Sequence, residues 1–252
     1  MIYTEFERRV KALRERGPRV REIACVGAAR TLLCVECGDA QALTVMISAG
    51  VHGDEPAGPA ALLAMLEDDG LDERFAYRIY PCTIPSGVDA GTRESTDGVD
   101  VNRTFGRGGS SPEAKAVIMS NRDRKFELAI DLHEDCDAQG FYCYEYGVGD
   151  VGAATIEAVE AAGFPIQTLG SDYDLGSALP PDAIRYERGI VRAQPIAEAE
   201  AIGGLSYALL LARNAARRVL TFETAARLPW ETRLAMHRTA LAGAISQLLA
   251  KR

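Results

Sequence analysis

Apolar and polar residues alternate along the chain in two ways, one typical of helices and one typical of strands. Residues 3–16 place Phe6, Val10 and Leu13 at helical spacing. Further helices are predicted over residues 57–66, 152–162, 204–214 and 231–251, with another helix start at Ser111-Pro112-Glu113. Short apolar runs predict strands over residues 30–37, 42–49, 78–85, 126–135, 141–146 and 217–224.

The order of these elements indicates the fold class. Strands alternate with helices, and the run at 42–49 is nearly all apolar, as expected of a strand covered on both faces. We therefore expect an α/β, three-layer sandwich with a mixed, largely parallel central sheet. With no internal repeat, low-complexity tract or linker, residues 1–252 are expected to form a single domain.

Candidate chemistry gathers where predicted strands end. His52, the long aperiodic loop at 86–111, His133 and Glu223 all follow or end a predicted strand. In a largely parallel sheet the ligand site lies beyond the carboxyl ends of the strands. These segments are therefore predicted to share one site.

Charge and composition exclude several classes of protein. Lys plus Arg number 28 against 36 Asp plus Glu, a net charge of −8, which argues against a nucleic-acid groove and against docking on anionic lipid. The charged first residues do not resemble a signal peptide, and no run approaches a membrane span. We expect a cytoplasmic protein with reduced thiols, in which Cys34 and Cys37 are strand residues and Cys136 is a neighbour of the site.

Two of the three histidines lie at these predicted strand ends. His52 and Glu55 lie three residues apart in a strand-to-helix loop, and His133 lies near a neighbouring strand end. Two imidazoles and one carboxylate leave a position for water, as in catalytic zinc sites. Alone, His-x-x-Glu arises by chance, and either histidine taken singly is better explained as an ordinary loop or buried strand residue. His237 is interpreted as a partly packed helix residue.

Five motifs in order extend this interpretation. They are AGVHGDE (49–55), PSGVDAGTRESTDGVDVNRTF (85–105), SPEAKAV (111–117), DLH (131–133) and LTFETA (220–225). Together they resemble the zinc carboxypeptidase family, including its short bacterial murein-peptide amidases. The chain is similar, more distantly, to the aspartoacylase and succinylglutamate desuccinylase branch.

The resemblance implies a role for each metal-site residue. His52, Glu55 and His133 match the family's zinc ligands, and Glu223 matches its catalytic glutamate. Zinc brings the pKa of a bound water to about 7, so this water would be the nucleophile. Glu223 would act as general base and then as general acid toward the leaving nitrogen.

The resemblance also implies substrate contacts in the long loop. Arg93 matches the residue that stabilises the developing oxyanion, and Asn102 with Arg103 matches the pair that grips the terminal carboxylate. Asp100 resembles the carboxylate that orients a zinc-bound imidazole. Without the resemblance, spacing alone would explain each arginine equally well as a solvated charge in the loop. Asp100 could equally be an ordinary turn residue.

The resemblance is incomplete before the helix at 204–214. Family members place a tyrosine on a segment that closes over the substrate, whereas residues 195–202 read PIAEAEAI. Glu198 and Glu200 have two interpretations. They would favour a substrate with an amino group, or they form the charged, solvated start of a helix. Three arginines nearby suit an acidic substrate or lie at the surface: Arg185, Arg188 and Arg192.

The sequence thus predicts zinc-dependent hydrolysis of a small peptide or peptide-like amide, with no nucleic-acid or membrane partner and with the oligomeric state left open. Two alternatives remain. One is an N-acyl amino acid deacylase of the succinylglutamate desuccinylase/aspartoacylase type, and the other is a binding module that retains the fold without activity. The intact Arg93 and Asp100-x-Asn102-Arg103 favour the peptidase.

Overall fold

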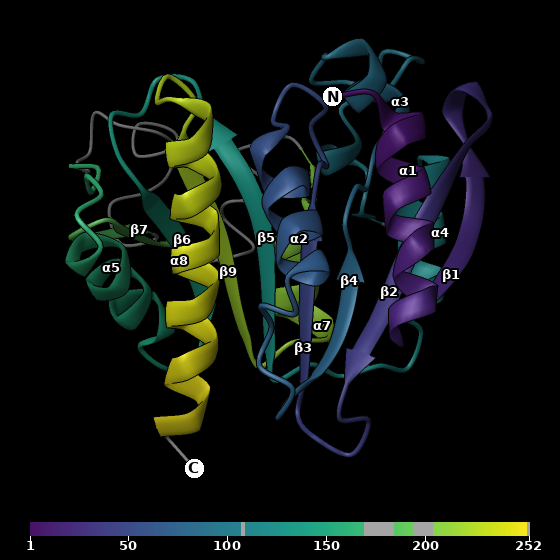
Figure 1. Ribbon diagram of the computed structural model, residues 1–252. Helices are drawn as coiled ribbons and strands as arrows, with labels where there is room; N and C mark the ends of the chain where they lie inside the picture. The colour runs from purple at the N-terminus through teal and green to yellow at the C-terminus, as the bar shows by residue number, and fades with distance from the viewer. Residues whose placement is uncertain (107–108, 169–183, 194–203, 251–252) are drawn as a thin grey trace.

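The computed structural model describes residues 1–106, 109–168, 184–193 and 204–250 (Figure 1). Its helices are α1 (Tyr3–Ala12), α2 (Ala57–Glu67), α3 (Pro85–Ala90), α4 (Pro112–Ser120), α5 (Val151–Ala161), α7 (Tyr207–Asn214) and α8 (Trp230–Ala250). Short 3-10 turns are η1 (Leu13–Arg16), η2 (Gly27–Ala29) and η3 (Val101–Arg103). The strands are β1 (Arg19–Val26), β2 (Arg30–Gly38), β3 (Thr44–Ala49), β4 (Ala76–Tyr80), β5 (Leu128–Asp135), β6 (Tyr142–Gly147), β7 (Ile184–Glu187), β8 (Ile190–Ala193) and β9 (Arg218–Ala225).

Within the described ranges, the nine strands form one sheet in the order β1-β2-β4-β3-β5-β9-β6-β8-β7. The central strands β4, β3, β5 and β9 run parallel, and β2 and β6 flank them in the antiparallel direction. Residues Val45–Ala49 of β3 are all buried, as expected for a central strand covered on both faces. The predicted mixed, largely parallel sheet is confirmed.

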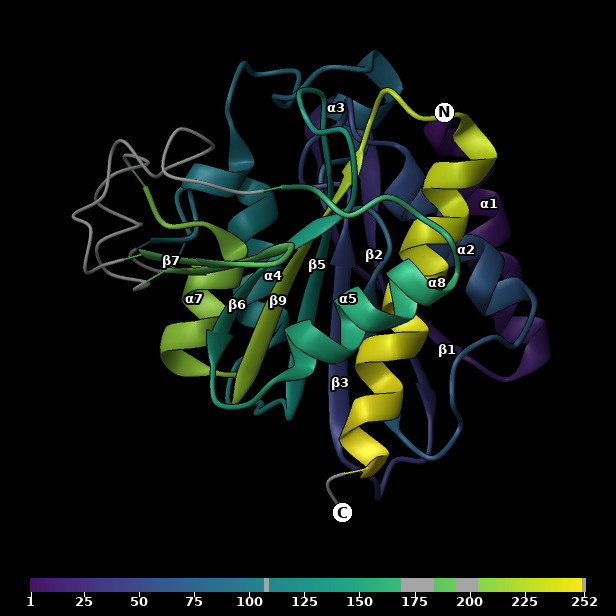
Figure 2. The same cartoon turned by 90° about the vertical axis from the view of Figure 1, so that its left-hand side faces the viewer.

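Helices cover both faces of the sheet (Figures 1 and 2). On one face, α1, α2, α5 and α8 bury an apolar core against alternate residues of β3, β5 and β9. On the other face, α4 and α7 pack over a second core. The arrangement is a three-layer sandwich, as predicted. Within the described residues, no helix combines the length and hydropathy needed to cross a bilayer.

Most predicted elements match the structure, and the differences have physical reasons. Ser111 caps α4, because its Oγ accepts a hydrogen bond from the Ala114 amide at 3.1 Å. The strand predicted at 78–85 ends at Tyr80, because the next residue, Pro81, has no N–H to donate to the sheet, and α3 begins at Pro85. Strand β1 was not predicted, because it lies at an edge of the sheet and its buried and exposed residues do not alternate regularly. Strands β7 and β8 lie between the predicted helices at 152–162 and 204–214, where the sequence predicted no element.

His237 is more deeply buried than the sequence suggested. Its side chain lies within α8 with no exposed surface, and Nε2 is 3.1 Å from Thr224 Oγ1. Its Nδ1 has no hydrogen-bond partner among the described residues. Burial, with a smaller contribution from nearby His133, lowers the pKa of His237 to about 3. His237 is therefore a neutral histidine beneath the sheet.

This burial makes stability depend on pH in a defined direction. The unfolded chain protonates His237 near pH 6.5, whereas the folded protein does so only near pH 3, so stability is lost as the pH falls below about 6.5. Between pH 6.5 and 5, we expect the unfolding free energy to fall by about 2 kcal/mol more in the wild type than in His237→Gln. Denaturant titrations at both pH values measure this difference. Identical pH dependence in the two proteins would contradict it.

Candidate metal centre

The loop between β3 and α2, which carries His52 and Glu55, depends on closely packed glycines. Gly50 follows β3 with φ +62°, a conformation that favours glycine. A Cβ on Gly53 would lie 2.0 Å from the carbonyl carbon of Gly87. The motif therefore lets this loop lie directly against α3, where the predicted long loop begins.

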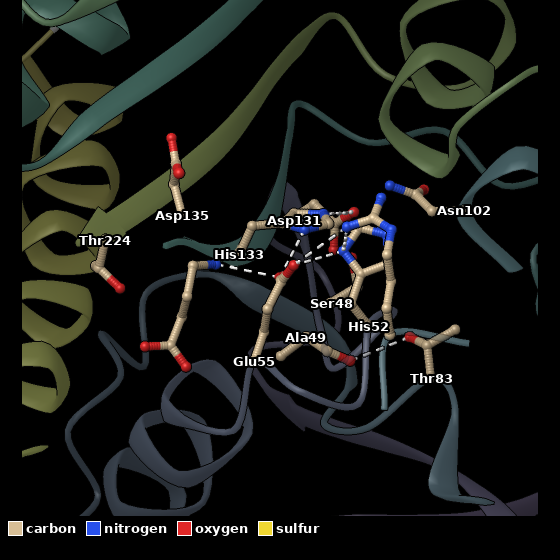
Figure 3. A network of polar contacts seen from close by, with 12 residues as sticks. Ser48, Ala49, His52, Glu55, Thr83, Asn102, Asp131, His133, Asp135 and Thr224 are labelled. Atoms are coloured by element: carbon tan, nitrogen blue, oxygen red, sulfur yellow. Dashed lines mark hydrogen bonds and ion pairs between the residues drawn. The ribbon is translucent and has the colours of Figure 1, made fainter. Parts of the chain in front are cut away.

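His52, Glu55 and His133 converge at the carboxyl ends of β3 and β5, as predicted (Figure 3). Glu55 Oε1 is 2.6 Å from His52 Nδ1, and Glu55 Oε2 is 2.9 Å from His133 Nδ1. One ligand atom from each residue lies within 4.8 Å of the others, and all three side chains are buried. The three residues form a candidate metal centre.

The outer nitrogen of each imidazole faces a second carboxylate. His133 Nε2 donates to Asp131 Oδ2 at 3.2 Å, and Ser48 Oγ donates to Asp131 Oδ1 at 2.6 Å. His52 Nε2 lies 3.5 Å from Asp100 Oδ1, the carboxylate that the resemblance placed beside a zinc-bound imidazole. Asp131 and Ser48 were not predicted. Strand alternation was the available signal for Asp131, because it lies two residues before His133 on the same face.

This arrangement fits a divalent cation. Each ring has carboxylate oxygens near both nitrogens, yet a neutral imidazole carries only one N–H. Burial disfavours the Glu55 anion, but His52 and His133 outweigh it and hold the pKa of Glu55 below its usual range. Burial likewise lowers the pKa of His133, but Glu55 and Asp131 raise it well above its usual value. A cation beside Nδ1 would satisfy Glu55 while both rings stay neutral, and zinc accepts this donor set.

Asp131 provides a test of the outer contacts. In Asp131→Asn the side chain still accepts from His133 but loses its charge, so we expect zinc affinity to fall about 10- to 100-fold. Competition with a chelating indicator measures the dissociation constant. Exposed Asp97→Asn, in the long loop, is the matched control and should bind as the wild type does. Equal affinity in both variants would remove Asp131 from the site.

Arg93 lies between the candidate metal centre and solvent. Its Nε donates to Asp100 Oδ2 at 3.1 Å, and its Nη1 is 3.3 Å from His52 Nδ1 and 3.8 Å from Glu55 Oε1. Burial opposes ionisation of Asp100, but its contact with His52 and the charge of Arg93 hold the pKa below its usual range. A guanidinium group thus lies at the edge of the metal centre, within reach of a molecule bound there.

A cavity of about 600 Å³ opens over the candidate metal centre. Seven of the eight predicted site residues line it: His52, Glu55, Arg93, Asn102, Arg103, His133 and Glu223. Asn102 is held in place because its Oδ1 accepts from the Tyr207 amide at 3.0 Å, at the start of α7. Residues of the long loop therefore face the same space as the histidines.

Glu223 enters the cavity from β9. It is the register partner of His133 on the adjacent parallel strand, about 4.8 Å away along the hydrogen-bonding direction. Register partners point to the same face of a sheet, so Glu223 shares the face of the metal centre. The half-buried side chain lines the cavity, as its predicted role requires.

Three tyrosines of β6 form a cavity wall that the sequence interpretation missed. Tyr142, Tyr144 and Tyr146 occupy alternate positions and are buried. Tyr142 is the register partner of Glu223, and Tyr144 that of Thr221. The alternation in YCYEY was the available signal, since period-two residues share one face of a strand. The wall extends the cavity beyond Glu223 along the sheet.

Other residues singled out in the sequence have different positions. Cys34 and Cys37 lie in β2, whereas exposed Cys136 lines the cavity. Arg192 forms ion pairs with Glu145 and with Glu187, which balance its charge within the sheet. Residues 195–202, including Glu198 and Glu200, lie outside the described residues.

A family model for the succinylglutamate desuccinylase/aspartoacylase catalytic domain matches residues 41–178. The match includes His52, His133 and the long loop and ends before Glu223. This branch is the one that the sequence resembled more distantly. Among curated proteins, no sequence matches the chain.

Solved structures share the fold. A candidate metallopeptidase from Shewanella amazonensis SB2B has a TM-score of 0.78 and 23% identity over 97% of this chain and 92% of its own. A metallo-carboxypeptidase from Burkholderia cenocepacia has a TM-score of 0.65 and 18% identity, covering 97% of this chain and 68% of its own. Bovine thrombin-activatable fibrinolysis inhibitor has a TM-score of 0.71 and 15% identity, covering 100% of this chain and 98% of its own. At these identities the similarity establishes the fold.

Proposed function

The chain belongs to the succinylglutamate desuccinylase/aspartoacylase family and has a carboxypeptidase-like fold, and from this premise we propose that it is a zinc-dependent hydrolase of a peptide or peptide-like amide. One observation carries the proposal. Glu55 bridges two imidazoles whose outer nitrogens face carboxylates, under a cavity that Glu223 and two arginines also line.

We assign the metal to His52, Glu55 and His133. When bound there, zinc supplies an activated water and polarises the substrate carbonyl. Asp131 and Asp100 orient the two rings from behind through their outer nitrogens. The buried surroundings strengthen every electrostatic contact made inside the cavity.

Glu223 is the proposed general base and acid. Its register with His133 places a carboxylate on the same face, one strand away from the metal centre. There it takes the proton of the attacking water and delivers it to the leaving nitrogen. Glu134, the other cavity glutamate beside the centre, is less suited to proton transfer, because one of its oxygens accepts from Ala57 and the other from Arg233.

The arginines bind and stabilise the substrate in this proposal. Arg93, at the edge of the metal centre, faces the position where negative charge develops on the carbonyl oxygen. Arg103 and Asn102 grip the carboxylate of the substrate, because a guanidinium group can donate two parallel hydrogen bonds to it. The preferred substrate is thus an amide next to a free carboxylate.

The family match favours a second candidate function. N-acyl amino acid deacylation also cleaves an amide beside a carboxylate, and the matched family bears the name of such enzymes. The two functions differ in the group on the carbonyl side of the bond, which is an aminoacyl residue in one case and a simple acyl chain in the other.

Matched substrates separate these functions. Alanylalanine and N-acetylalanine present the same alanine on the nitrogen side of the amide, so their kcat/KM values compare only the carbonyl side, and a murein-type tripeptide extends the peptide series. We expect the peptides to be cleaved faster, and amidation of the terminal carboxylate to reduce the rate because Arg103 loses its partner. Activity on N-acyl amino acids alone would replace the peptidase with the deacylase. A zinc-loaded protein inactive on every substrate would favour a binding module.

We also propose that residues 1–252 form one domain. Helix α1 near the N-terminus and α8 near the C-terminus contribute to the same apolar core, and α8 packs against α2 and α5. A single cooperative unfolding transition seen by both far-UV and near-UV circular dichroism supports this.

A further inference from the structure

Glu134, directly after His133 in β5, occupies the centre of a buried polar cluster. Its Oε2 accepts from the Ala57 amide at 2.8 Å, and its Oε1 accepts from Arg233 Nη1 at 2.7 Å. Its own amide donates to Glu55 Oε2 at 3.1 Å. The side chain is 1% exposed, so these contacts replace its hydration.

Arg233, in α8, provides the positive charge that pairs with Glu134 in this cluster. Its guanidinium carbon lies 5.0 Å from the centre of the Trp230 ring, and its side chain is 17% exposed. Stacking on an aromatic face and burial restrict the guanidinium group. The first turn of α8 is therefore fixed to the end of β5.

These contacts hold Glu55 from two directions. Glu55 Oε2 accepts the Glu134 amide, so the backbone position of Glu134 sets where that oxygen lies. The Glu134 side chain holds Ala57, two residues after Glu55, at the start of α2. Displacing Glu134 would move both restraints on this ligand together.

We propose that Arg233 is a positioning residue for Glu55, acting through Glu134. The inference rests on the proposed metal site. Arg233 is absent from the residues that line the cavity, so it acts without touching the substrate. Helix α8 thereby becomes part of the functional site, although it packs on the opposite face of the sheet from α4 and α7.

Zinc affinity of the full chain tests this proposal, measured by competition with a chelating indicator at a temperature where every variant is folded. Arg233→Met removes the contact and should raise the dissociation constant about 10- to 100-fold. Arg233→Lys keeps a cation and should raise it less than about 10-fold. The control is Arg238→Met, on the same helix, where Arg238 pairs with Asp68 in solvent at 3.1 Å. It should bind zinc as the wild type does.

Arg233→Met leaves a buried charge unpaired, which threatens folding. The double variant Glu134→Gln/Arg233→Met removes both charges. Its zinc affinity tests the proposal if the single variant does not fold. It should show the same loss of affinity. Unchanged affinity in the double variant, even with a lower thermal midpoint, would overturn the positioning role. Failure of the wild type itself to bind zinc would instead overturn the proposed function.

Discussion

Glu223→Gln should reduce turnover by about 10²- to 10⁴-fold while the protein keeps its zinc. Glutamine has the same shape but cannot take a proton from water, so the loss reflects proton transfer alone. At about 1.4 kcal/mol per factor of ten, this corresponds to roughly 3–6 kcal/mol of transition-state stabilisation. Steady-state kinetics, together with metal analysis of the same samples, measures both quantities.

The control for Glu223→Gln is Glu157→Gln, the same substitution at an exposed position of α5. We expect full activity from the control. If Glu223→Gln retains wild-type turnover with zinc bound, Glu223 is not the base. If its zinc is lost as well, the carboxylate takes part in holding the metal.

Zinc should raise the thermal midpoint of the metal-free protein by roughly 5–10 °C at a free concentration 100 times the dissociation constant. Binding to the folded state alone adds about 2.7 kcal/mol under that condition, and each kcal/mol shifts the midpoint of a chain of this size by about 2–4 °C. The ligands lie on the β3–α2 loop and on β5, so the ion joins two buried segments. Thermal melts with and without zinc measure the shift.

His52→Ala should abolish this shift, because two ligands hold the ion far less tightly than three. The matched control is His237→Gln, which alters the buried histidine outside the triad and should keep the zinc-dependent shift. A shift of wild-type size in His52→Ala would place the zinc elsewhere.

The sequence predicted that His52, Glu55 and His133 come together, as they do in the structure, whereas their role as metal ligands stays a prediction. His52 and Glu55 are three residues apart in one loop, and the glycines of AGVHGDE allow that loop to lie against α3. His133 and Glu223 each end an apolar strand, and parallel strands bring such ends to one edge of the sheet. These relations can be predicted from spacing and strand order.

Contacts between distant elements were beyond the sequence pattern. The 231–251 helix was predicted, but its crossing angle decides that Arg233 reaches Glu134, and no periodicity encodes it. The Ser48–Asp131 hydrogen bond likewise depends on β3 pairing with β5, which are separated by 78 residues between Ala49 and Leu128. The tyrosine wall of β6 required knowing that β6 lies next to β9.

Zinc K-edge X-ray absorption of the loaded protein tests the central claim most directly, namely that His52, Glu55 and His133 share one ion. The competing cluster in the described residues, Asp135–Cys136–Asp137, contains a thiol at the mouth of the same cavity. We expect only nitrogen and oxygen neighbours at about 2.0–2.2 Å, with imidazole scattering that weakens in His133→Ala. A sulfur neighbour at about 2.3 Å, or a spectrum unchanged in His133→Ala, would contradict the claim.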